Sequence, residues 1–588
     1  MQINRRSSRV LSLSLLTAAL LLTACGGTTP TAGPTAGFAQ TQGTGELSQT
    51  AITGTIYRVP GPQFTTATDV TLYAINTGFK PGDQILFDAA QGPFEGFLYF
   101  PANNKGTATS PITIGSFNGR ATLQVTDPNQ SGIFLENVAG YDIGNLNIVG
   151  PGAGVSQKDG VIAYNTLSGN VRLNFLNFHD LNVSGFGSGG ISVGGNNGFS
   201  GYTQVFIKDS ITHDNRKAGI QVFGPAALPA DTDYANRDIY IGNNKAYNNF
   251  GDAASTTSNT GSGILVGNAQ RVTIERNVAH DNGKFNTAVG GPIGIWVYDT
   301  DRATIQFNES YNNRTNSTAD GGGFDLDGGV TNSVMQYNYS HGNDGAGYLI
   351  AQYPGARALY RNTVRYNISQ NDARKHGYGA IELYGEMRDI DIYNNTVFMD
   401  AVGAAEVPSA LLITRPGTFQ SGDGQNYDIG PISNVRVANN IFYSRNGARL
   451  LSVGGGNTGI VLRSNSYFAD GPSRPASYFY GYGGNFGNGT NFYQGTAYAS
   501  LAAFRNATGQ EVGGVQGNPR LMNAGGGQTI GNAYQFQALA AYQLQSTSPI
   551  RNNGLNLASQ FGINAGATDF YGVAIPAGSG FSRGASDM

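Results

Sequence analysis

One stretch of sequence decides the fold, and it reads SGILVGNAQRVTIERNVAHDNGKFNTAVGGPIGIWVYDTDRATIQFN (262–308). It holds one pattern twice: a short segment in which apolar residues alternate with others, followed further on by Ile-x-x-Asn. Alternation with a period of two predicts β-strands, because successive side chains of a strand point to opposite faces. The Ile-x-x-Asn elements end at Asn277 and Asn308. The stretch therefore predicts repeated turns of one structural unit.

The same unit extends in both directions along the chain. Its first asparagine recurs at Asn244, Asn277, Asn308, Asn338, Asn367, Asn395, Asn440 and Asn465. The steps between these positions are 33, 31, 30, 29, 28, 45 and 25 residues, which is too irregular for helical-pair repeats of fixed length. A second column follows five residues later, at Asn249, Asn282, Asn313, Asn343 and Asp372. Stacked side-chain amides can hydrogen-bond to the amides above and below, so these columns predict asparagine ladders.

A short strand follows each pair of ladder positions. These strands read GGISVGG (189–195), AGIQVFG (218–224), SGILVGN (262–268), IGIWVYD (293–299), GGFDLDG (322–328), AGYLIAQ (346–352) and GAIELYG (379–385). One face of the set is apolar and includes Ile191, Ile220, Ile264, Ile295, Phe324, Tyr348 and Ile381. Aligned apolar columns fill the interior of a coil whose neighbours stack as parallel strands. The sequence thus predicts an all-β solenoid with one continuous core.

The ladders, the strand register and the coil length resemble the pectate-lyase-like superfamily of right-handed parallel β-helices. KPGD (80–83) and GSFNG (115–119) are similar to the first coils of such proteins, and DFYG (569–572) is similar to their closing segment. The resemblance covers nearly all of the chain after about residue 50. It implies the fold but leaves the function open, because the superfamily includes lyases, hydrolases, epimerases and adhesins without enzymatic activity.

We predict a β-helix over residues 51–470 and terminal coils with a cap over 471–588. Residues 401–430 stretch one coil without clear alternation, which predicts an excursion loop beside the strand SALLITRP (409–416). One helical pattern lies near residues 500–508. A cap is expected because an uncovered parallel edge would invite aggregation.

The N-terminus predicts export. Arginines precede an apolar run over residues 10–22 that is too short to span a membrane, which indicates a signal peptide over residues 1–24. Leu22-Thr23-Ala24-Cys25 resembles a bacterial lipobox, and this resemblance implies lipidation of Cys25, the only cysteine. An ordinary secretory signal beside a coincidental cysteine is the alternative. Residues 25–50 are rich in Gly, Thr, Pro and Ser and predict a flexible tether.

The amino-acid composition limits the kinds of molecule that the protein can bind. Only 12% of residues are charged, the net charge is −3, and no basic stripe offers a surface to nucleic acid. We expect a monomer that is held at the outer membrane or cell surface by a lipid anchor and that binds a polysaccharide. An adhesin or glycan-binding protein without catalytic activity remains an alternative.

The outward positions of the strand stack change character near the middle of the chain. From residue 293 to residue 386 the face gains aromatic and acidic residues, and it includes Trp296, the only tryptophan. Flat rings stack on the apolar faces of sugars, and carboxylates serve acid/base chemistry. We therefore predict a glycoside hydrolase whose acid and base come from Asp325, Asp327 and Glu382. The predicted substrate-binding residues are Trp296, Tyr298, Asp299, Gln352, Tyr384, Glu386 and Arg415.

A polysaccharide lyase is the second hypothesis. Resemblance to lyases of this fold implies a Lys or Arg base, for which Arg415, Lys217 and Lys375 are the candidates. Ca²⁺ would then neutralise a uronate, held by Asp299, Asp325 and Asp327. The outward strand face carries no lysine, which favours the hydrolase. A further alternative is that these carboxylates only keep the surface solvated.

Overall fold

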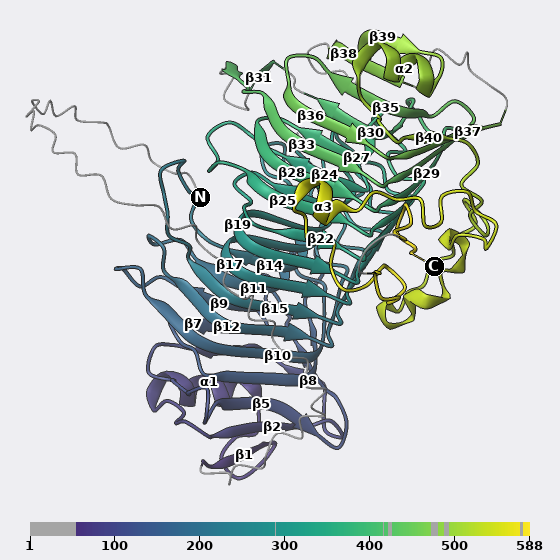
Figure 1. The fold of residues 1–588 in the computed structure, drawn as a ribbon. Coiled ribbons are helices and arrows are strands. Elements are labelled where there is room, and N and C mark those ends of the chain that lie inside the picture. The colour runs from purple at the N-terminus through teal and green to yellow at the C-terminus, as the bar shows by residue number, and fades with distance from the viewer. Residues whose placement is uncertain are drawn as a thin grey trace, which may run out of the picture. The chain divides into compact units, whose positions relative to one another are not determined.

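The computed structural model describes residues 54–288, 290–414, 417–420, 426–471, 480–486, 493–576 and 580–587. The predicted signal peptide, Cys25 and the predicted tether lie outside these residues. The described chain forms a right-handed parallel β-helix, which confirms the predicted fold class (Figure 1). Across these described ranges, no helix is both long enough and apolar enough to cross a membrane.

Three stacks of parallel strands build the solenoid, and we name them face A, face B and face C in the order in which the chain meets them in each coil. Face A carries the strands predicted from the sequence. Its strands are β4 (Leu98–Phe100), β7 (Ile133–Glu136), β9 (Val161–Asn165), β11 (Gly189–Gly195), β14 (Ala218–Phe223), the first parts of β17 (Ser262–Glu275) and β19 (Ile293–Gln306), β21 (Gly322–Asp327), β24 (Tyr348–Ala351), β27 (Gly379–Tyr384), β30 (Ser409–Thr414), β35 (Arg449–Gly454) and β38 (Tyr480–Phe486).

Faces B and C close each coil. Face B contains β1 (Ile56–Val59), β2 (Gln84–Asp88), β5 (Ile112–Phe117), β8 (Tyr141–Val149), β10 (Arg172–Ser184), β12 (Gly201–Lys208), β15 (Asn236–Gly242), the second parts of β17 and β19, β22 (Val334–Gln336), β25 (Tyr360–Arg365), β28 (Met387–Tyr393), β33 (Ile432–Ala438) and β36 (Thr458–Arg463). Face C contains β3 (Phe94–Glu95), β6 (Ala121–Gln124), the ends of β8 and β10, β13 (Ile211–His213), β16 (Lys245–Tyr247), β18 (Val278–His280), β20 (Glu309–Tyr311), β23 (Tyr339–His341), β26 (Ile368–Gln370), β29 (Thr396–Asp400), β34 (Ile441–Arg445), β37 (Ser466–Asp470) and β40 (Val515–Gln516).

The core lies inside the coils. The apolar columns predicted from the sequence are buried there, and Ile295, Phe324 and Ile381 each have 0% exposure. Strand β19 pairs in parallel with β21, and β21 is joined to β27 through β24, so each column stacks one side chain per coil. Burial of such stacked side chains is the main stabilising contribution to a solenoid.

Both predicted asparagine ladders are present. In the first ladder each amide nitrogen donates to the side-chain oxygen of the next asparagine, from Asn244 through Asn465, at distances such as 3.0 Å for Asn244 to Asn277 and 2.9 Å for Asn440 to Asn465. This ladder ends on Glu511, whose carboxylate accepts from Asn465 at 2.7 Å. The second ladder ends on Asp372, which accepts from Asn343 at 2.7 Å. The ladder residues are buried with their polar groups paired.

A helix covers the first coils, and the sequence analysis did not identify it. Helix α1 (Ala67–Asn76) buries Ala67, Val70 and Ala74 against the solenoid. Thr66 and Asp69 form a capping box that satisfies backbone N–H groups at its start. The helix predicted near residue 500 is α2 (Leu501–Thr508), which starts after the N-cap Ser500.

The end of the chain turns back along the side of the solenoid. Residues 519–576 and 580–587 pack along the solenoid: the segment with η2 (Ala533–Ala538) and η3 (Ala540–Tyr542) contacts face C, and α3 (Leu557–Phe561) contacts Arg436 of β33 on face B (Figure 1). Gln370 binds the backbone of Gly527, and Glu309 accepts from Ile530 and Gly531. We predicted terminal coils and a cap for residues 471–588, and the structure adds this lateral cover. The strand β39 (Tyr493–Tyr498) pairs antiparallel with β38.

The predicted excursion after β30 contains a hairpin of β31 (Thr418–Gln420) and β32 (Asn426–Asp428), which pair antiparallel. In Figure 1 this hairpin projects from the edge of the coils. Arg415 lies outside the described residues.

Candidate active site

The register on face A is the one predicted from the sequence. Trp296 pairs with Asp325, which pairs with Leu349, and Leu349 pairs with Glu382. Tyr298 pairs with Asp327 in the next outward column. The neighbouring residues of each strand belong to the interior core, whereas Trp296, Asp325 and Glu382 do not. The alternation therefore sets these three side chains on the outer side of face A.

The exposure of this column differs from the prediction. We expected an open strip, but Trp296 is 5% exposed, Asp325 is 4% exposed and Glu382 is fully buried. Asp320 and Tyr378 lie near this column, on the loops that lead into β21 and β27: the charge of Asp320 raises the pKa of Asp325, and burial together with the charges of Asp320 and Glu382 raises that of Tyr378. The Trp296 Nε1 donates to the Ser262 hydroxyl at 3.0 Å. The column is therefore less exposed than strand alternation alone would leave it.

Four acidic side chains meet beneath these loops: Asp320, Asp325, Asp327 and Glu382, which we name the carboxyl cluster. Burial raises the pKa of Asp327 to about 7 and that of Glu382 to about 8. Burial also raises the pKa of Asp325 well above its ordinary value, and the charges of the other three members raise it further. Within the ranges that the structure describes, none of the four forms an ion pair. The cluster therefore holds protons at neutral pH.

The hydrogen bonds of the cluster are incomplete. Glu382 Oε2 accepts from the Gly379 N–H at 2.9 Å, while Glu382 Oε1 and Asp325 Oδ1 are buried without a hydrogen-bond partner. Asp320 Oδ1 accepts from the Tyr378 hydroxyl at 3.1 Å. Buried polar groups in folded proteins are usually paired, so exceptions mark candidate functional sites.

Two members of the cluster reach solvent. Asp320 and Asp327 are partly exposed, whereas Asp325 and Glu382 are not. Asp325 and Asp327 are same-face neighbours on β21, so their Cα atoms lie about 7 Å apart. Asp325 and Glu382 lie two strands apart, or about 9 to 10 Å between Cα atoms. These separations are within reach of the carboxyl spacing of an inverting glycosidase.

Aromatic side chains border the cluster. Tyr298 and Tyr384 are half-buried in the second outward column, and the ring of Trp296 lies 5.5 Å from that of Tyr298. Tyr353, just after β24, is 39% exposed, and partial burial of its hydroxyl, together with the charge of Asp327, raises its pKa. Together these rings offer flat apolar surfaces beside the acids.

Asp299 belongs to the wall of the site and not to the cluster. It lies at the bend between the two parts of β19, where its φ is 49°. Asp299 Oδ1 lies 3.3 Å from Arg357 Nε, and Asn268 donates to its other oxygen at 3.3 Å. Burial raises the pKa of Asp299 to about 6 against the effect of Arg357. The ion pair gives Asp299 an anchoring position in the wall.

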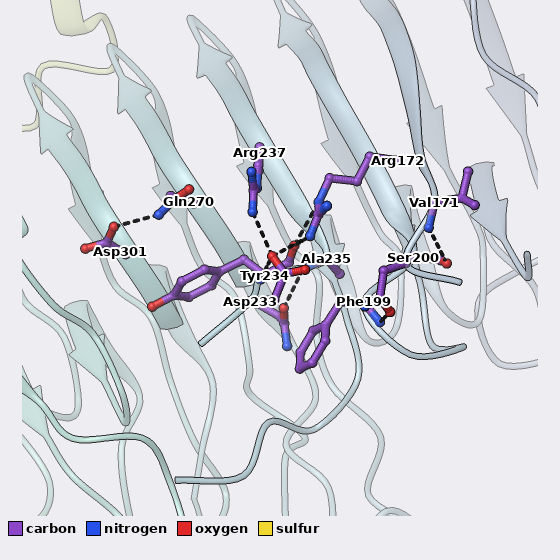
Figure 2. Close-up of polar contacts among 12 residues, drawn as sticks. Val171, Arg172, Phe199, Ser200, Asp233, Tyr234, Ala235, Arg237, Gln270 and Asp301 are labelled. Atoms are coloured by element: carbon purple, nitrogen blue, oxygen red, sulfur yellow. Dashed lines mark hydrogen bonds and ion pairs between the residues drawn. The ribbon is translucent and has the colours of Figure 1, made fainter. Parts of the chain in front are cut away.

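A network of arginines fixes the loop that faces Arg357. Asp233 accepts from Arg172 at 2.6 Å and from Arg237 at 2.7 Å, as Figure 2 shows. Arg357 stacks over the ring of Tyr234, 4.2 Å from its centroid, and donates to the Asp233 carbonyl. The loop after β24 is thereby tied to the loop after β14, which lies four strands away on face A.

The remaining predicted residues lie at the edge of the site. Gln352 accepts from the Gly329 N–H at 3.2 Å and donates to the Arg357 carbonyl at 2.8 Å, so it fixes a turn. Glu386 is exposed. The Lys375 ammonium donates to the Thr315 carbonyl, so it binds a loop. Lys217 lies beside the buried Asp159, away from the cluster.

Sequence reasoning missed Asp320, Tyr353, Arg357 and Tyr378. All four lie on loops between strands, where the repeat gives no register. The one available signal was the motif Asp320-Gly-Gly-Gly, in which an acid directly precedes the glycines that introduce β21.

The Ca²⁺ ligands of the lyase hypothesis are not brought together. Asp325 and Asp327 share the cluster, but Asp299 is paired with Arg357. Among the residues that the structure describes, no group of three or more His, Cys, Asp or Glu side chains is arranged to hold a metal ion.

Comparison with known proteins adds a family model and several similar chains. A model described as a right handed beta helix region matches residues 233–397, from just before β15 into β29. The lacto-N-biosidase of Bifidobacterium longum subsp. longum is 40% identical over 78 residues, which make up 13% of this chain and 4% of that protein.

Solved structures of two carbohydrate-active proteins are also similar. The GH136 lacto-N-biosidase of Eubacterium ramulus aligns with a TM-score of 0.40 and 17% identity, over 61% of this chain and 67% of that one. The mannuronan C-5 epimerase A-module of Azotobacter vinelandii aligns with a TM-score of 0.41 and 12% identity, over 79% of this chain and 100% of that one.

Proposed function

We propose that this protein is a glycoside hydrolase that cleaves a glycan at the carboxyl cluster. The observation that carries the proposal is a set of four acids with raised pKa values, two of which have an unpaired buried oxygen, bordered by aromatic rings. Glycosidases require one carboxyl group that keeps its proton near neutral pH and a second that is ionised. The similarity to a protein named lacto-N-biosidase supports a carbohydrate substrate.

The exposure of the four acids assigns their roles in this proposal. Asp327 is partly exposed and its pKa of about 7 suits a general acid, because a group that titrates near the working pH transfers protons best. Asp320 is also partly exposed, and hydrogen bonds from Tyr378 and the Gly291 N–H oppose the effect of burial on its pKa. Donors aimed at a carboxylate favour its ionised form, so Asp320 is the base.

The two buried acids support this pair. Asp325 lies between the exposed members in the sequence and Glu382 lies two strands further on, and neither is open to a sugar. Their raised pKa values keep both protonated near neutral pH, so the negative charge that favours an oxocarbenium-like transition state comes from the exposed pair. Trp296 backs the ring of Tyr298, which contacts the sugar together with Tyr384.

The test is a glycan screen with matched variants. The panel contains neutral plant, fungal and bacterial polysaccharides, polyuronates, and glycans that end in lacto-N-biose, because of the relative's name. Wild type should release reducing ends without unsaturated products. Asp327→Asn and Asp320→Asn should each lower the rate by about 10²–10⁴-fold, the range for loss of an acid or base. Asp281→Asn, at an acid in a turn beside His280, should leave the rate unchanged.

The screen also separates the alternatives. Ultraviolet-absorbing unsaturated products that disappear on chelation of divalent cations would establish a Ca²⁺-dependent lyase and overturn the proposal. Tight binding of a glycan without any product would establish a glycan-binding protein or adhesin. Retained activity in both Asp variants would move the active site elsewhere.

We further propose that Cys25 is lipidated and anchors the protein outside the cytoplasm. Its place after Leu22-Thr23-Ala24 supports this. Two acyl chains provide stable membrane anchoring, whereas one does not. In the native host, Cys25→Ser should move the protein from the membrane fraction to the soluble fraction, and an unchanged distribution would contradict the proposal.

A further inference from the structure

Three aromatic rings on face A lie directly over glycines of the preceding strand. A Cβ atom on Gly267 of β17 would come within 2.0 Å of the Tyr298 ring, and one on Gly328 would come within 2.2 Å of the Tyr353 ring. A Cβ on Gly194 of β11 would lie 2.8 Å from Cγ of Phe223. Each ring can lie along the sheet only because its neighbour lacks a side chain. The rings therefore form flat platforms on the outer side of the strands.

The platforms recur at every second strand. Face A runs in the order β11, β14, β17, β19, β21, and two of the covered glycines belong to β11 and β17, while the third, Gly328, lies in the turn directly after β21. With strands about 4.8 Å apart, successive platforms are about 9 to 10 Å apart. The ring of Tyr164, on β9, lies only 5.9 Å from that of Phe223, so these two rings together form the first platform.

The outer positions beside the first two platforms carry no charge. On β9, β11, β14 and β17 they are Ile162, Tyr164, Ser192, Gly194, Gln221, Phe223, Leu265 and Gly267. Further along, the carboxyl cluster offers acids and no cation. A polyuronate would therefore meet no cation on these strands that could pair with its carboxylates. The row therefore favours a neutral chain.

We propose that face A from Tyr164 to Tyr353 binds a neutral, extended polysaccharide of the β-1,4-linked, two-fold type. In such a chain each sugar advances by about one strand spacing and turns over relative to the last, so every second sugar presents the same face. Platforms at every second strand match that repeat, and each ring stacks on the apolar face of one sugar. The inference that this chain is cleaved rests on the proposed function, but its binding does not.

Binding is measured on Asp327→Asn protein, so that no substrate is consumed. The probes are β-1,4-linked gluco-, manno- and xylo-oligosaccharides of about two to about eight sugars, with oligogalacturonates and α-1,4-linked malto-oligosaccharides for comparison. For at least one neutral β-1,4-linked series, affinity should rise by about 10-fold for each added pair of sugars, the effect of one aromatic contact. A rise that stops at two sugars, or tighter binding of oligogalacturonates or malto-oligosaccharides, would overturn the proposal.

Two variants locate the row. Phe223→Ala should lower affinity for the longest oligosaccharides by about 10-fold and leave that for the shortest unchanged. Gly267→Ala should have a similar effect without removing any ring, because its new Cβ displaces the Tyr298 ring. Phe206→Ala, at a half-buried ring on face B, is the matched control. Circular dichroism and thermal unfolding confirm that each variant is folded.

The outcomes distinguish this inference from the proposed function. Length-dependent binding without hydrolysis by wild type would contradict the hydrolase but support the row of platforms. Hydrolysis with length-independent binding, or normal binding in Gly267→Ala, would contradict the platforms and leave the hydrolase intact.

Discussion

The asparagine ladders and the carboxyl cluster are both sets of buried polar side chains, yet they are built in opposite ways. In the first ladder, Asn338 accepts from Asn308 and donates to Asn367, with side-chain contacts of 3.0 and 3.1 Å. In the cluster, Asp325 Oδ1 and Glu382 Oε1 have no hydrogen-bond partner. The ladder contains neutral amides, which both donate and accept, whereas the cluster contains only acids.

This difference indicates that the ladders stabilise the fold, whereas the carboxyl cluster does not. A network whose members are all satisfied rigidifies the fold, and a partly satisfied one costs free energy. The cluster keeps that cost on a part of face A where acids and aromatic rings meet. Natural proteins retain such groups mainly where function requires them.

The largest expected effect comes from breaking the ladder. Asn338→Ala removes the acceptor of Asn308 and the donor to the Ile305 carbonyl, and leaves these buried groups unpaired. We expect the free energy of unfolding to fall by about 3–5 kcal/mol, measured by guanidinium denaturation. Asn316→Ala, at an exposed loop position, should change it by less than about 0.5 kcal/mol. If the two substitutions lowered the free energy of unfolding equally, the ladder would not stabilise the fold as we propose.

A substitution in the carboxyl cluster should have an intermediate effect of opposite sign and raise the free energy of unfolding. The pKa of Glu382 is raised from 4.5 to about 8, so the folded state keeps a proton that the unfolded state loses. The stability from this group is complete below about pH 4.5 and is lost as the pH rises to about 8. Glu382→Gln removes that loss and should raise the free energy of unfolding at pH 8 by about 1–3 kcal/mol.

The measurement is a series of denaturation curves between pH 5 and pH 8.5. The stability difference between Glu382→Gln and wild type should grow as the pH rises. A difference that is constant with pH, or one that shrinks, would show that Glu382 is not protonated in the folded protein.

The smallest effect on the free energy of unfolding is expected at Asp372, a carboxyl group that belongs to a ladder and can be compared with Glu382. Asp372 is as buried as Glu382, but it accepts from Asn343 at 2.7 Å and from Ser369 at 2.6 Å. Asp372→Asn should therefore lower the free energy of unfolding by about 1 kcal/mol at pH 7, because Ser369 loses its acceptor. A stabilising effect like that expected for Glu382→Gln would mean that burial alone determines the effect of both substitutions and that the hydrogen bonds of Asp372 do not matter.

The sequence predicted those parts of the structure that repeat. The coil register, the inward columns at Ile295 and Phe324, and both ladders follow from periodicity, because each coil must present the same faces to its neighbours. The low exposure of Asp325 and Glu382 could not be predicted from the periodicity. It depends on loops of irregular length, which bring Asp320 and Tyr378 close to these acids.

Two further elements lay beyond the repeat. Helix α1 interrupts the first coil, and the Thr66–Asp69 capping box was its one local signal. Residues 519–576 and 580–587 contain little regular secondary structure. Their position beside faces B and C depends on long-range contacts such as Gln370 with Gly527 and Arg365 with Asn564, which no local pattern encodes.

The ladders have a direction, and that direction determines how they stop. Every amide in the first column passes its N–H toward the next coil, so the last one needs a recipient that has nothing to pass on. Glu511 fills this role for Asn465, and Asp372 fills it for Asn343. A carboxylate only accepts, so it terminates the relay without leaving a stranded donor. Each column therefore carries its own stop signal, and lengthening that column would first require replacing the acid with an amide, although the coils themselves continue past Asp372.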